Sequence, residues 1–562
     1  LIIYPIFHQN LHQILLTWWG SQLEFLMSCI ATSVGLGNVW RFSFVAYQNG
    51  GGAFLIPYLI VLLIIGKPMY YLECVLGQFS SRNSVRVWSC APGMKGNISQ
   101  STLCILYILS YYVAIVALCL YYLVMSFKSP LPWAMCNKDW DNCLPSDPSL
   151  QSKDDKNIEN GTSSAELYFV YVSYFEFPTP ILSLTICLLV SWLMIFLIVS
   201  QGVKSSGKAA YFLALFPYIV MIILLISTIT LPGAGHGILF FITPQWSRLL
   251  ELNVWYAAVT QVFFSLAVGT GPLIMFSSYN SFTSNVHRDS MIVTTLDTFT
   301  SLLSGFTIFG ILGNLAYVLK SDIEDVVGSG GTGLAFVSYP DAIAKTFMPQ
   351  LYAILFFTMM VVLGIGSAVA FVSTINTVFL DAFPHVRTIY ITSINCCIGF
   401  ACGLVYVTPG GQFILELVDY YGATFLALFC AICEIVGIVW VYGLENVCLD
   451  LELMLGQKTS PYWRFCWGII TPVVMIVVFC YAILNFDALV FGGYYYYPSL
   501  AYGKIPTLIV LANRSVYSSE VAGSIPTAGQ VFVHKKSVNI CSESWCSGTM
   551  VLVVPGSLDR ES

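Results

Sequence analysis

Two glycine-rich interruptions place polar residues inside otherwise apolar stretches. The first reads SVGLGN at residues 33–38, and the second reads SLAVGTGP at residues 265–272. Each glycine in a helix interior costs about 1 kcal/mol and Pro272 removes a backbone donor, so we expect both helices to be unwound there. Backbone groups freed at bilayer depth need protein, water or a ligand as partner, and inward-facing carbonyls suit a bare cation. The pattern predicts a solute-binding cavity; close helix packing through small residues is the alternative.

Long apolar stretches must position these interruptions. The chain has 562 residues, 57% of them hydrophobic and 9% charged, with mean hydropathy +0.78, whereas roughly a quarter of the residues in soluble domains are charged. A soluble fold is excluded, and the small net charge of −6 does not indicate nucleic acid as a partner. Stretches long enough to cross a bilayer as helices occur at residues 23–46, 53–79, 101–127, 179–200, 208–231, 252–279, 290–318, 348–382, 388–408, 412–442 and 465–485.

The two interruptions lie at the start of two five-span halves, and matching broken segments in two halves indicate a transporter site at their interface. We therefore expect an all-α polytopic membrane protein with an inverted five-helix repeat. Helices 1 and 6 are broken, eleven spans are recognisable and a twelfth is missing. The transmembrane domain covers residues 18–502; residues 1–17 are left unassigned, and residues 503–562 form an atypical tail, either disordered or mis-spliced.

A hydrophilic loop at residues 128–177 orients the chain in the bilayer. It contains Cys136 and Cys143, which an oxidising exterior would let pair, and the glycosylation sequon at Asn160. With this loop outside, the short loops that carry Lys and Arg face the cytoplasm, as the positive-inside rule requires. We expect a multi-pass plasma-membrane protein with a disulfide and a glycan. The sequence leaves its oligomeric state open.

Two long motifs resemble a known family. The run VGLGNVWRFSFVAYQNGGG at residues 34–52 resembles the first-helix signature of the neurotransmitter:sodium symporter family, and QVFFSLAVGTG at residues 261–271 resembles its sixth helix. Within this family, the chain is most similar to the insect sodium-dependent nutrient amino acid transporters. The resemblance implies a sodium-coupled symporter that imports amino acids by alternating access.

The resemblance implies two sodium sites, of which the first also contacts the substrate. This site would use the Ser33 carbonyl and the side chains of Asn38, Ser265 and Asp297. Most of the family has Asn at the position of Asp297. A carboxylate there strengthens cation binding, broadens the choice of ion, or is protonated when the site is empty.

The second sodium site would use carbonyls of Ala31, Val34 and Leu363 with the side chain of Ser367. Gly366 stands where the family has a residue with a side-chain oxygen. One ligand is therefore missing, and we expect this site to bind sodium more weakly.

The chloride site of animal family members would use Tyr58, Gln261, Ser265 and Ser301. All four residues are of the expected type. Asp297 nevertheless places negative charge nearby, so the sequence leaves chloride coupling open.

The substrate class follows from the resemblance at Gly35, where monoamine carriers have Asp. Gly35 leaves room for a carboxylate and so implies an α-amino acid. Tyr112 resembles the tyrosine that hydrogen-bonds this carboxylate, with a packing role as the alternative, and Thr270 replaces a bulky residue, which favours a neutral, large or aromatic amino acid. The residues expected to bind substrate are Ser33, Gly35, Gly37, Tyr112, Phe264, Ser265, Ala267, Thr270 and Ser367.

Four residues resemble the gates of alternating access. Arg41 and Asp419 match the outer ion pair, and Tyr279 and Asp381 match the inner gate. Leu16 occupies the position of the inner arginine, which reflects either a loosened gate or an altered N-terminal segment.

Two function classes follow from these residues. The first is a sodium-coupled symporter of neutral amino acids. The second is a non-transporting membrane protein that keeps a binding site or serves as a partner subunit, as Leu16, Gly366 and the missing twelfth span suggest. We do not expect an enzyme, because no nucleophile lies at catalytic spacing from a base or metal cluster.

Overall fold

The structure is a computed structural model that describes residues 19–91, 97–138, 140, 142–147, 162–174, 181–320, 323, 334–346, 348–408, 410–484, 490–491 and 495–497. Three predictions from the sequence lie outside these residues. They are the unassigned segment 1–17, the glycan at Asn160 and the tail at 503–562.

The described residues are mostly helical, which confirms the all-α prediction. The α-helices are α2 (Gln22–Ser33), α3 (Phe42–Gln48), α4 (Gly52–Val61), α5 (Lys67–Ser80), α6 (Asn97–Ser126), α7 (Ser164–Tyr174), α8 (Leu182–Val199), α9 (Val203–Ile229), α10 (Ala234–Ile242), α11 (Leu252–Leu266), α12 (Pro272–Ser277), α13 (Val286–Leu319), α14 (Tyr339–Ala344), α15 (Pro349–Ala382), α16 (Thr388–Gly403), α17 (Gly411–Val418), α18 (Leu426–Ile435), α19 (Leu444–Leu455), α20 (Pro461–Phe465) and α21 (Thr471–Leu484).

Shorter elements join these helices. The π-helical segments are Gly37–Arg41, Leu62–Gly66, Leu334–Ser338, Asp419–Phe425, Val436–Gly443 and Cys466–Ile470, and the 3₁₀ turns are Arg86–Cys90, Pro132–Ala134 and Arg248–Leu250. Strand β1 (Cys143–Leu144) pairs in parallel with β2 (Thr162–Ser163), and β3 (Val490–Phe491) pairs antiparallel with β4 (Tyr495–Tyr496).

The helices coincide with the apolar stretches that the sequence marks as spans. Within the described part of the chain, eight helices are long and apolar enough to cross a membrane, or nine if α2 and the helix from Gly37 to Gln48 count as one bent span. The shorter apolar helices α11 and α16 lie at two further predicted spans. The polytopic membrane fold is thus confirmed, while the number eleven and the inverted repeat stay predictions.

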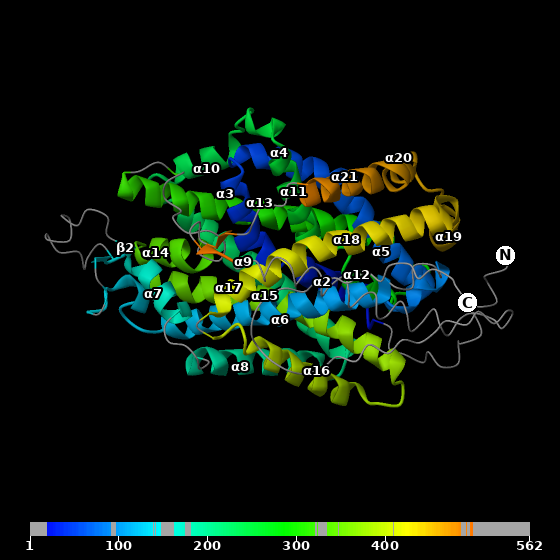
Figure 1. Cartoon of the computed structure of the whole chain (residues 1–562), viewed down its shortest axis with the longest axis horizontal. Coiled ribbons are helices and arrows are strands. Elements are labelled where there is room, and N and C mark those ends of the chain that lie inside the picture. The colour runs from blue at the N-terminus through cyan, green and yellow to red at the C-terminus, as the bar shows by residue number, and fades with distance from the viewer. Residues whose placement is uncertain are drawn as a thin grey trace, which may run out of the picture. The chain divides into compact units, whose positions relative to one another are not determined.

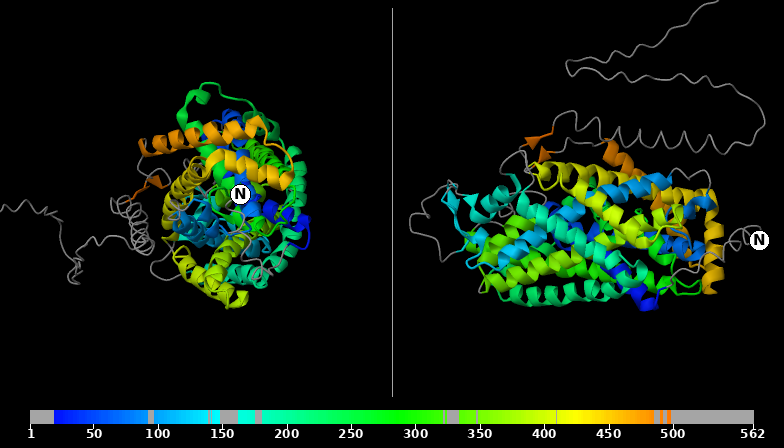
Figure 2. Two further views of the ribbon diagram at one scale, coloured as in Figure 1. Left: turned by 90° about the vertical axis from the view of Figure 1, so that its right-hand side faces the viewer. Right: turned by 90° about the horizontal axis from the view of Figure 1, so that it is seen from below.

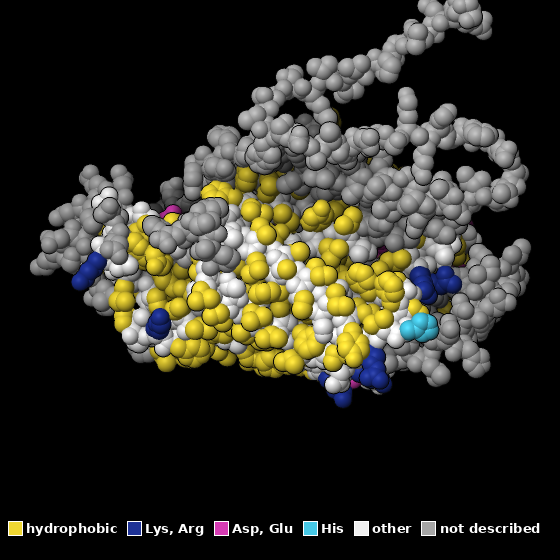
Figure 3. Space-filling model, turned by 60° about the horizontal axis from the view of Figure 1, so that its bottom comes forward, with side chains coloured by type: hydrophobic (Ala, Val, Ile, Leu, Met, Phe, Trp, Pro, Cys, Tyr) yellow, Lys and Arg dark blue, Asp and Glu magenta, His cyan; other side chains and the backbone are white. Residues whose placement is uncertain are grey.

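Two long helices, α6 and α15, pack side by side in the interior, as Figure 1 shows. The middle of α15, from Met359 to Asn376, is buried throughout. Helices α8 and α16 pack together on the outside, and α8 exposes Leu182, Leu193 and Leu197. Figure 3 shows an apolar face of this kind, with Lys and Arg confined to its two ends. A bilayer can solvate such a face, because its lipid tails are as apolar as these side chains.

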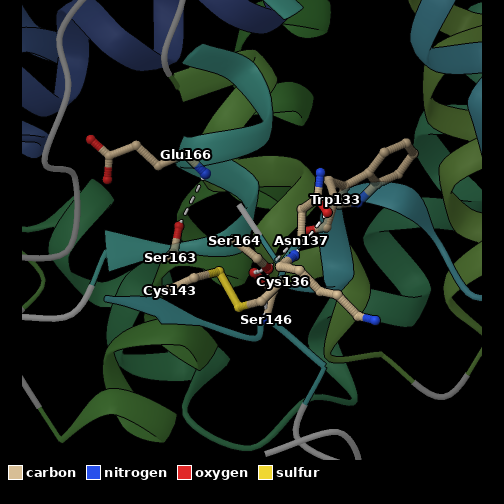
Figure 4. Close-up of a disulfide and its surroundings, with 9 residues drawn as sticks. Trp133, Cys136, Asn137, Cys143, Ser146, Ser163, Ser164 and Glu166 are labelled. Atoms are coloured by element: carbon tan, nitrogen blue, oxygen red, sulfur yellow. Dashed lines mark hydrogen bonds between the residues drawn. A yellow bond between two sulfur atoms is a disulfide. The ribbon is translucent and has the colours of Figure 1, made fainter. Parts of the chain in front are cut away.

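The two ends of the helix bundle differ. Figures 1 and 2 place α7 and α14 at one end and α19 at the other. At the α7 end, Cys136 and Cys143 form the predicted disulfide, with a Cα–Cα distance of 5.8 Å. Figure 4 shows its surroundings, where the buried Ser164 hydroxyl donates to the Trp133 carbonyl at 2.8 Å. We refer to the Cys136–Cys143 disulfide, together with Trp133 and Ser164, as the disulfide cap.

Candidate functional site

The first helix is broken where the sequence predicts. Helix α2 ends at Ser33, and the chain resumes as a helix at Gly37 after a 47° bend. Side chains satisfy the freed backbone: the Gly35 amide donates to Asn38 Oδ1 at 3.1 Å, and the Leu36 amide donates to the Tyr112 hydroxyl at 3.3 Å. The break is therefore stabilised partly by a distant helix, α6.

The second break separates α11 from α12. Three residues in it have positive φ, namely Ala267 at 53°, Gly269 at 78° and Gly271 at 98°. Glycine adopts these angles freely, whereas Ala267 does so at a steric cost. The buried Glu73 of α5 accepts a hydrogen bond from the Gly269 amide at 2.6 Å, and the Thr270 hydroxyl donates to the Ala267 carbonyl at 2.6 Å. The unwound turn thus has its own hydrogen-bonding partners.

One cavity lies against both breaks. Its lining includes all nine residues that the sequence predicts to bind substrate. Sequence reasoning assigned Asn38 and Arg41 to other roles, and it missed eight further lining residues, which are Thr32, Ile108, Thr260, Phe263, Val268, Phe371, Ala427 and Leu428. Ile108 lies four residues before Tyr112 and Phe371 four residues after Ser367, so helical spacing from the predicted residues could have found both.

The two glycines of the first break are required by close neighbours. A Cβ at Gly35 would lie 2.5 Å from Ser367 Oγ and 3.1 Å from the Tyr112 hydroxyl. A Cβ at Gly37 would lie 2.7 Å from the Phe264 ring. Both positions border the cavity, so any larger residue there would intrude on it or displace its walls.

Three of the four residues predicted for the first sodium site, Asn38, Ser265 and Asp297, form one buried polar network. Asn38 Nδ2 donates to Asp297 Oδ1 at 2.7 Å and to Ser265 Oγ at 3.0 Å. The Ser265 hydroxyl also donates to the carboxylate of Asp297, at 2.9 and 3.0 Å to its two oxygens. Asp297 is fully buried, and the Ser33 hydroxyl beside the break has no hydrogen-bond partner among the described residues. A buried carboxylate that contacts Asn38 at the first break is chemistry that suits a hard cation, which prefers oxygen ligands.

The residues predicted for chloride adjoin the same network, because Asn38 Nδ2 also donates to Ser301 Oγ at 3.0 Å. The Tyr58 hydroxyl donates to Ser301 Oγ at 3.4 Å, which brings these two residues together. Ser265 donates to Asp297 instead, and Gln261 Nε2 donates to the Gly37 carbonyl at 3.1 Å. Three of the four predicted residues, Tyr58, Gln261 and Ser265, therefore already donate to other protein groups.

At the predicted second sodium site, α2 and α15 make close contact. The Ser367 hydroxyl donates to the Thr32 carbonyl at 3.0 Å. A Cβ at Gly366 would lie only 2.6 Å from the Ala31 carbonyl oxygen. Glycine here permits the close approach of the two backbones and supplies no side-chain ligand.

The predicted outer gate lies beside the cavity, because Arg41 lines it, whereas Asp381 of the predicted inner gate lies farther along α15, near its end. Arg41 and Asp419 form an ion pair at 3.4 Å, and the Arg41 guanidinium lies 4.1 Å from the centre of the Phe264 ring. Tyr111 donates to the same carboxylate at 2.5 Å. At the end of α15, Asp381 pairs with Arg86 at 3.4 Å, a partner that the sequence did not reveal.

The chain is similar to known proteins over most of its length. The family model described as the sodium:neurotransmitter symporter family matches residues 17–518. The chain is 53% identical over 514 residues to "Sodium-dependent nutrient amino acid transporter 1" of Drosophila erecta, covering 85% of this chain and 80% of the relative. The proteins of the same name from Drosophila melanogaster and Drosophila ananassae are 53% and 51% identical over 512 and 521 residues, and the matches cover 85% of this chain and 79% and 81% of those relatives.

Proposed function

The chain belongs to the sodium:neurotransmitter symporter family, and on this basis we propose that it imports neutral α-amino acids with sodium by alternating access across the plasma membrane. Sodium-coupled amino acid transport follows from the family and from the names of its relatives. The observation that carries the finer proposal is the cavity where the two broken helices meet.

The cavity suits the two charged groups of an amino acid at different points. We propose that the substrate carboxylate binds near Tyr112 and the start of the helix at Gly37, because a helix N-terminus attracts negative charge. The substrate amine is placed near the carbonyls freed at the second break, around Phe264 and Ala267. Unwound backbone thereby replaces charged side chains in recognition.

The remaining wall favours an uncharged side chain. Ile108, Phe263, Val268, Phe371 and Leu428 all line the cavity. Among the described lining residues, Arg41 is the sole charged one, and it is paired with Asp419. An acidic or basic substrate side chain would be desolvated in this cavity without a counter-ion.

The first sodium site is proposed to be the network formed by Asn38, Ser265 and Asp297. The buried Asp297 carboxylate needs compensating charge, which a cation supplies. The same negative charge reduces the need for chloride, so we propose that chloride has at most a minor effect on transport.

The test is uptake of radiolabelled amino acids by cells that express the protein at their surface. We expect uptake of neutral amino acids in sodium medium and its loss in choline medium. Absence of uptake across a broad amino acid panel, in sodium and in potassium, would refute the proposal. Thermal stabilisation by an amino acid without flux would instead support the non-transporting alternative.

A further inference from the structure

The chain segment after α5 closes the end of the bundle that lies opposite the disulfide cap. Ser81 has a left-handed backbone, with φ of 49°, and turns the chain at the end of α5. The next residues lead into a short helical turn, Arg86–Cys90. We call residues 81–91 the clamp segment. The sequence predicts that this end of the bundle faces the cytoplasm.

Two residues of the clamp segment hold the end of α15. Asn83 is 3% exposed, and its amide donates to Asp381 Oδ2 at 2.6 Å and to the Thr377 carbonyl at 3.4 Å. Arg86 approaches the same carboxylate oxygen at 3.4 Å and donates through Nη2 to the Asp381 backbone carbonyl at 2.8 Å. Asp381 thus receives both an amide and a guanidinium from one segment.

The Asn83 side chain is held in the orientation that this contact needs. Its Oδ1 accepts hydrogen bonds from the amides of Val85 at 3.0 Å and Arg86 at 2.8 Å. These bonds direct the amide nitrogen toward α15, because the oxygen is engaged with its own loop. Asn83 therefore connects the backbone conformation of the clamp segment to the hydrogen bond that the segment makes with Asp381.

On its other side, the clamp segment packs against the second broken helix. A Cβ at Gly271, just before α12, would lie 2.8 Å from Ser84 Cβ. A Cβ at Gly77 in α5 would overlap the Ile274 carbonyl oxygen in α12, so these backbones touch. Gln78 Nε2 donates to the carbonyls of Phe282 and Ser284 at 3.1 and 2.8 Å, beyond the end of α12. Helix α5, the clamp segment and α12 therefore form one packed block.

The seam between α12 and α15 leads from the cavity to Asp381. Gly271 lies next to the cavity and faces α15, since a Cβ at this position would lie 4.0 Å from Thr374 Cγ2. Further along the seam, Tyr279 of the predicted inner gate lies close to Thr377 and Asp381. Asn83 and Arg86 cross the seam at the end that lies farther from the cavity. Opening the seam requires breaking their contacts with α15.

We propose that Asn83 and Arg86 are the inner-gate partners of Asp381 and that the clamp segment must release α15 before substrate leaves toward the cytoplasm. The ion pair alone is partly exposed, and such pairs contribute little by themselves. The short hydrogen bond from the buried Asn83 to a charged acceptor is the stronger contact. The proposal rests on the proposed transport function, because it assigns these residues to one step of the transport cycle.

A thiol reporter in the seam tests the proposal without measuring transport. Thr374 is fully buried in α15, and Thr374→Cys places a thiol between the cavity and Asp381. The full-length protein in inside-out membrane vesicles is treated with a membrane-impermeant maleimide in sodium-free buffer. The parent without the reporter gives the background from the native cysteines. We expect Arg86→Gln and Asn83→Asp each to raise the labelling rate of the reporter at least fivefold.

A matched control removes another ion pair at the same end. Arg464 of α20 pairs with Glu445 of α19 at 3.0 Å, an ion pair in which the clamp segment takes no part, so Arg464→Gln should leave the rate within twofold. The labelling rate of Arg86→Lys, which keeps the charge, should lie between the rates of Arg86→Gln and the parent. Unchanged labelling in both clamp variants at normal expression, or an equal rise in Arg464→Gln, overturns the proposal. A failure of amino acid uptake would refute only the transport function, since labelling is measured independently.

Discussion

Among single residues, Asp297 dominates the polar network beside the cavity. Its carboxylate accepts hydrogen bonds from Asn38 and Ser265, and it is fully removed from solvent. A buried carboxylate is costly unless a cation or a proton compensates its charge. In the proposed sodium site, this one residue therefore connects the cation to the geometry of the first break, through its hydrogen bond with Asn38.

Asp297→Asn should weaken the dependence of uptake on sodium. The neutral amide keeps the size of the side chain but removes the charge that attracts the cation, which corresponds to roughly a tenfold rise in the half-saturating sodium concentration, or about 1.4 kcal/mol. Uptake measured against sodium concentration checks this. Glu445→Gln, at an exposed carboxylate, serves as the control. An unchanged sodium profile in Asp297→Asn would remove this residue from the cation site.

Gly37→Ala should impair amino acid binding. Its Cβ would lie 2.7 Å from the Phe264 ring, which must then move from its position over the cavity. We expect KM for the amino acid to rise roughly tenfold at similar surface expression, as a misplaced binding group predicts. Gly235→Ala is the matched control, because no described atom lies within 4 Å of its Cβ position. Equal KM values for the two variants would contradict the assigned role of Phe264.

Among the helices, each of the two broken ones depends on side chains from its neighbours. Tyr112 of α6 and Ser367 of α15 bind the backbone of the first break, and Glu73 of α5 binds that of the second. A helix interrupted in a bilayer without such partners would leave unpaired polar groups in an apolar medium. The broken helices are consequently stable only within the assembled bundle.

Gly269→Ala should destabilise the second break. Its φ of 78° disfavours any side chain, and a Cβ would lie 2.7 Å from Ala431 Cβ in α18. Strain alone costs about 1–2 kcal/mol, and the clash adds to it. Gly456→Ala separates the two effects, because Gly456 has φ of 66° and no described atom within 4 Å of its Cβ position. Thermal unfolding in detergent should show a larger fall in Tm for Gly269→Ala than for Gly456→Ala. Equal falls in Tm would mean that α18 moves aside at no cost in stability.

In the bundle as a whole, polar contacts close the cavity toward both ends. The Arg41–Asp419 pair covers Phe264 on one side, and Asp381 with the clamp segment closes the other. Figure 1 places α17, just before Asp419, toward the disulfide cap, and α12 toward the opposite end. We therefore expect that opening the cavity toward either end requires breaking polar contacts.

Removing the disulfide should weaken the cap without altering ion binding. The Trp133 indole donates to the Pro340 carbonyl of α14 at 3.1 Å, so the cap joins segments far apart in sequence. Disulfides typically contribute about 2–4 kcal/mol, and we expect a lower Tm for Cys136→Ser with an unchanged sodium profile. Cys397→Ser, at an exposed free cysteine, is the control. An unchanged Tm for Cys136→Ser would show that packing alone holds the cap.

The membrane class, the positions of the two breaks and about half of the cavity lining could be predicted from the sequence. These features are local: apolar length predicts spans, and glycine and proline interrupt helices wherever they fall in them. The local pattern locates Gly35 and Gly37 at the first break, whereas the cavity roles of Tyr112, Ser265, Thr270 and Ser367 were assigned through the resemblance to the family.

The contacts between distant side chains became known only from the packing of the helices. Arg86 and Asp381 are separated by 295 positions, and nothing in either local pattern indicates that they pair. Ser265 was expected at the first sodium site and at the chloride site, and its hydroxyl donates to Asp297 of the first sodium site. Ala267 adopts positive φ without being glycine, because hydrogen bonds and packing around the second break over-determine its backbone. Contacts of this kind depend on how whole helices pack, which apolar periodicity does not specify.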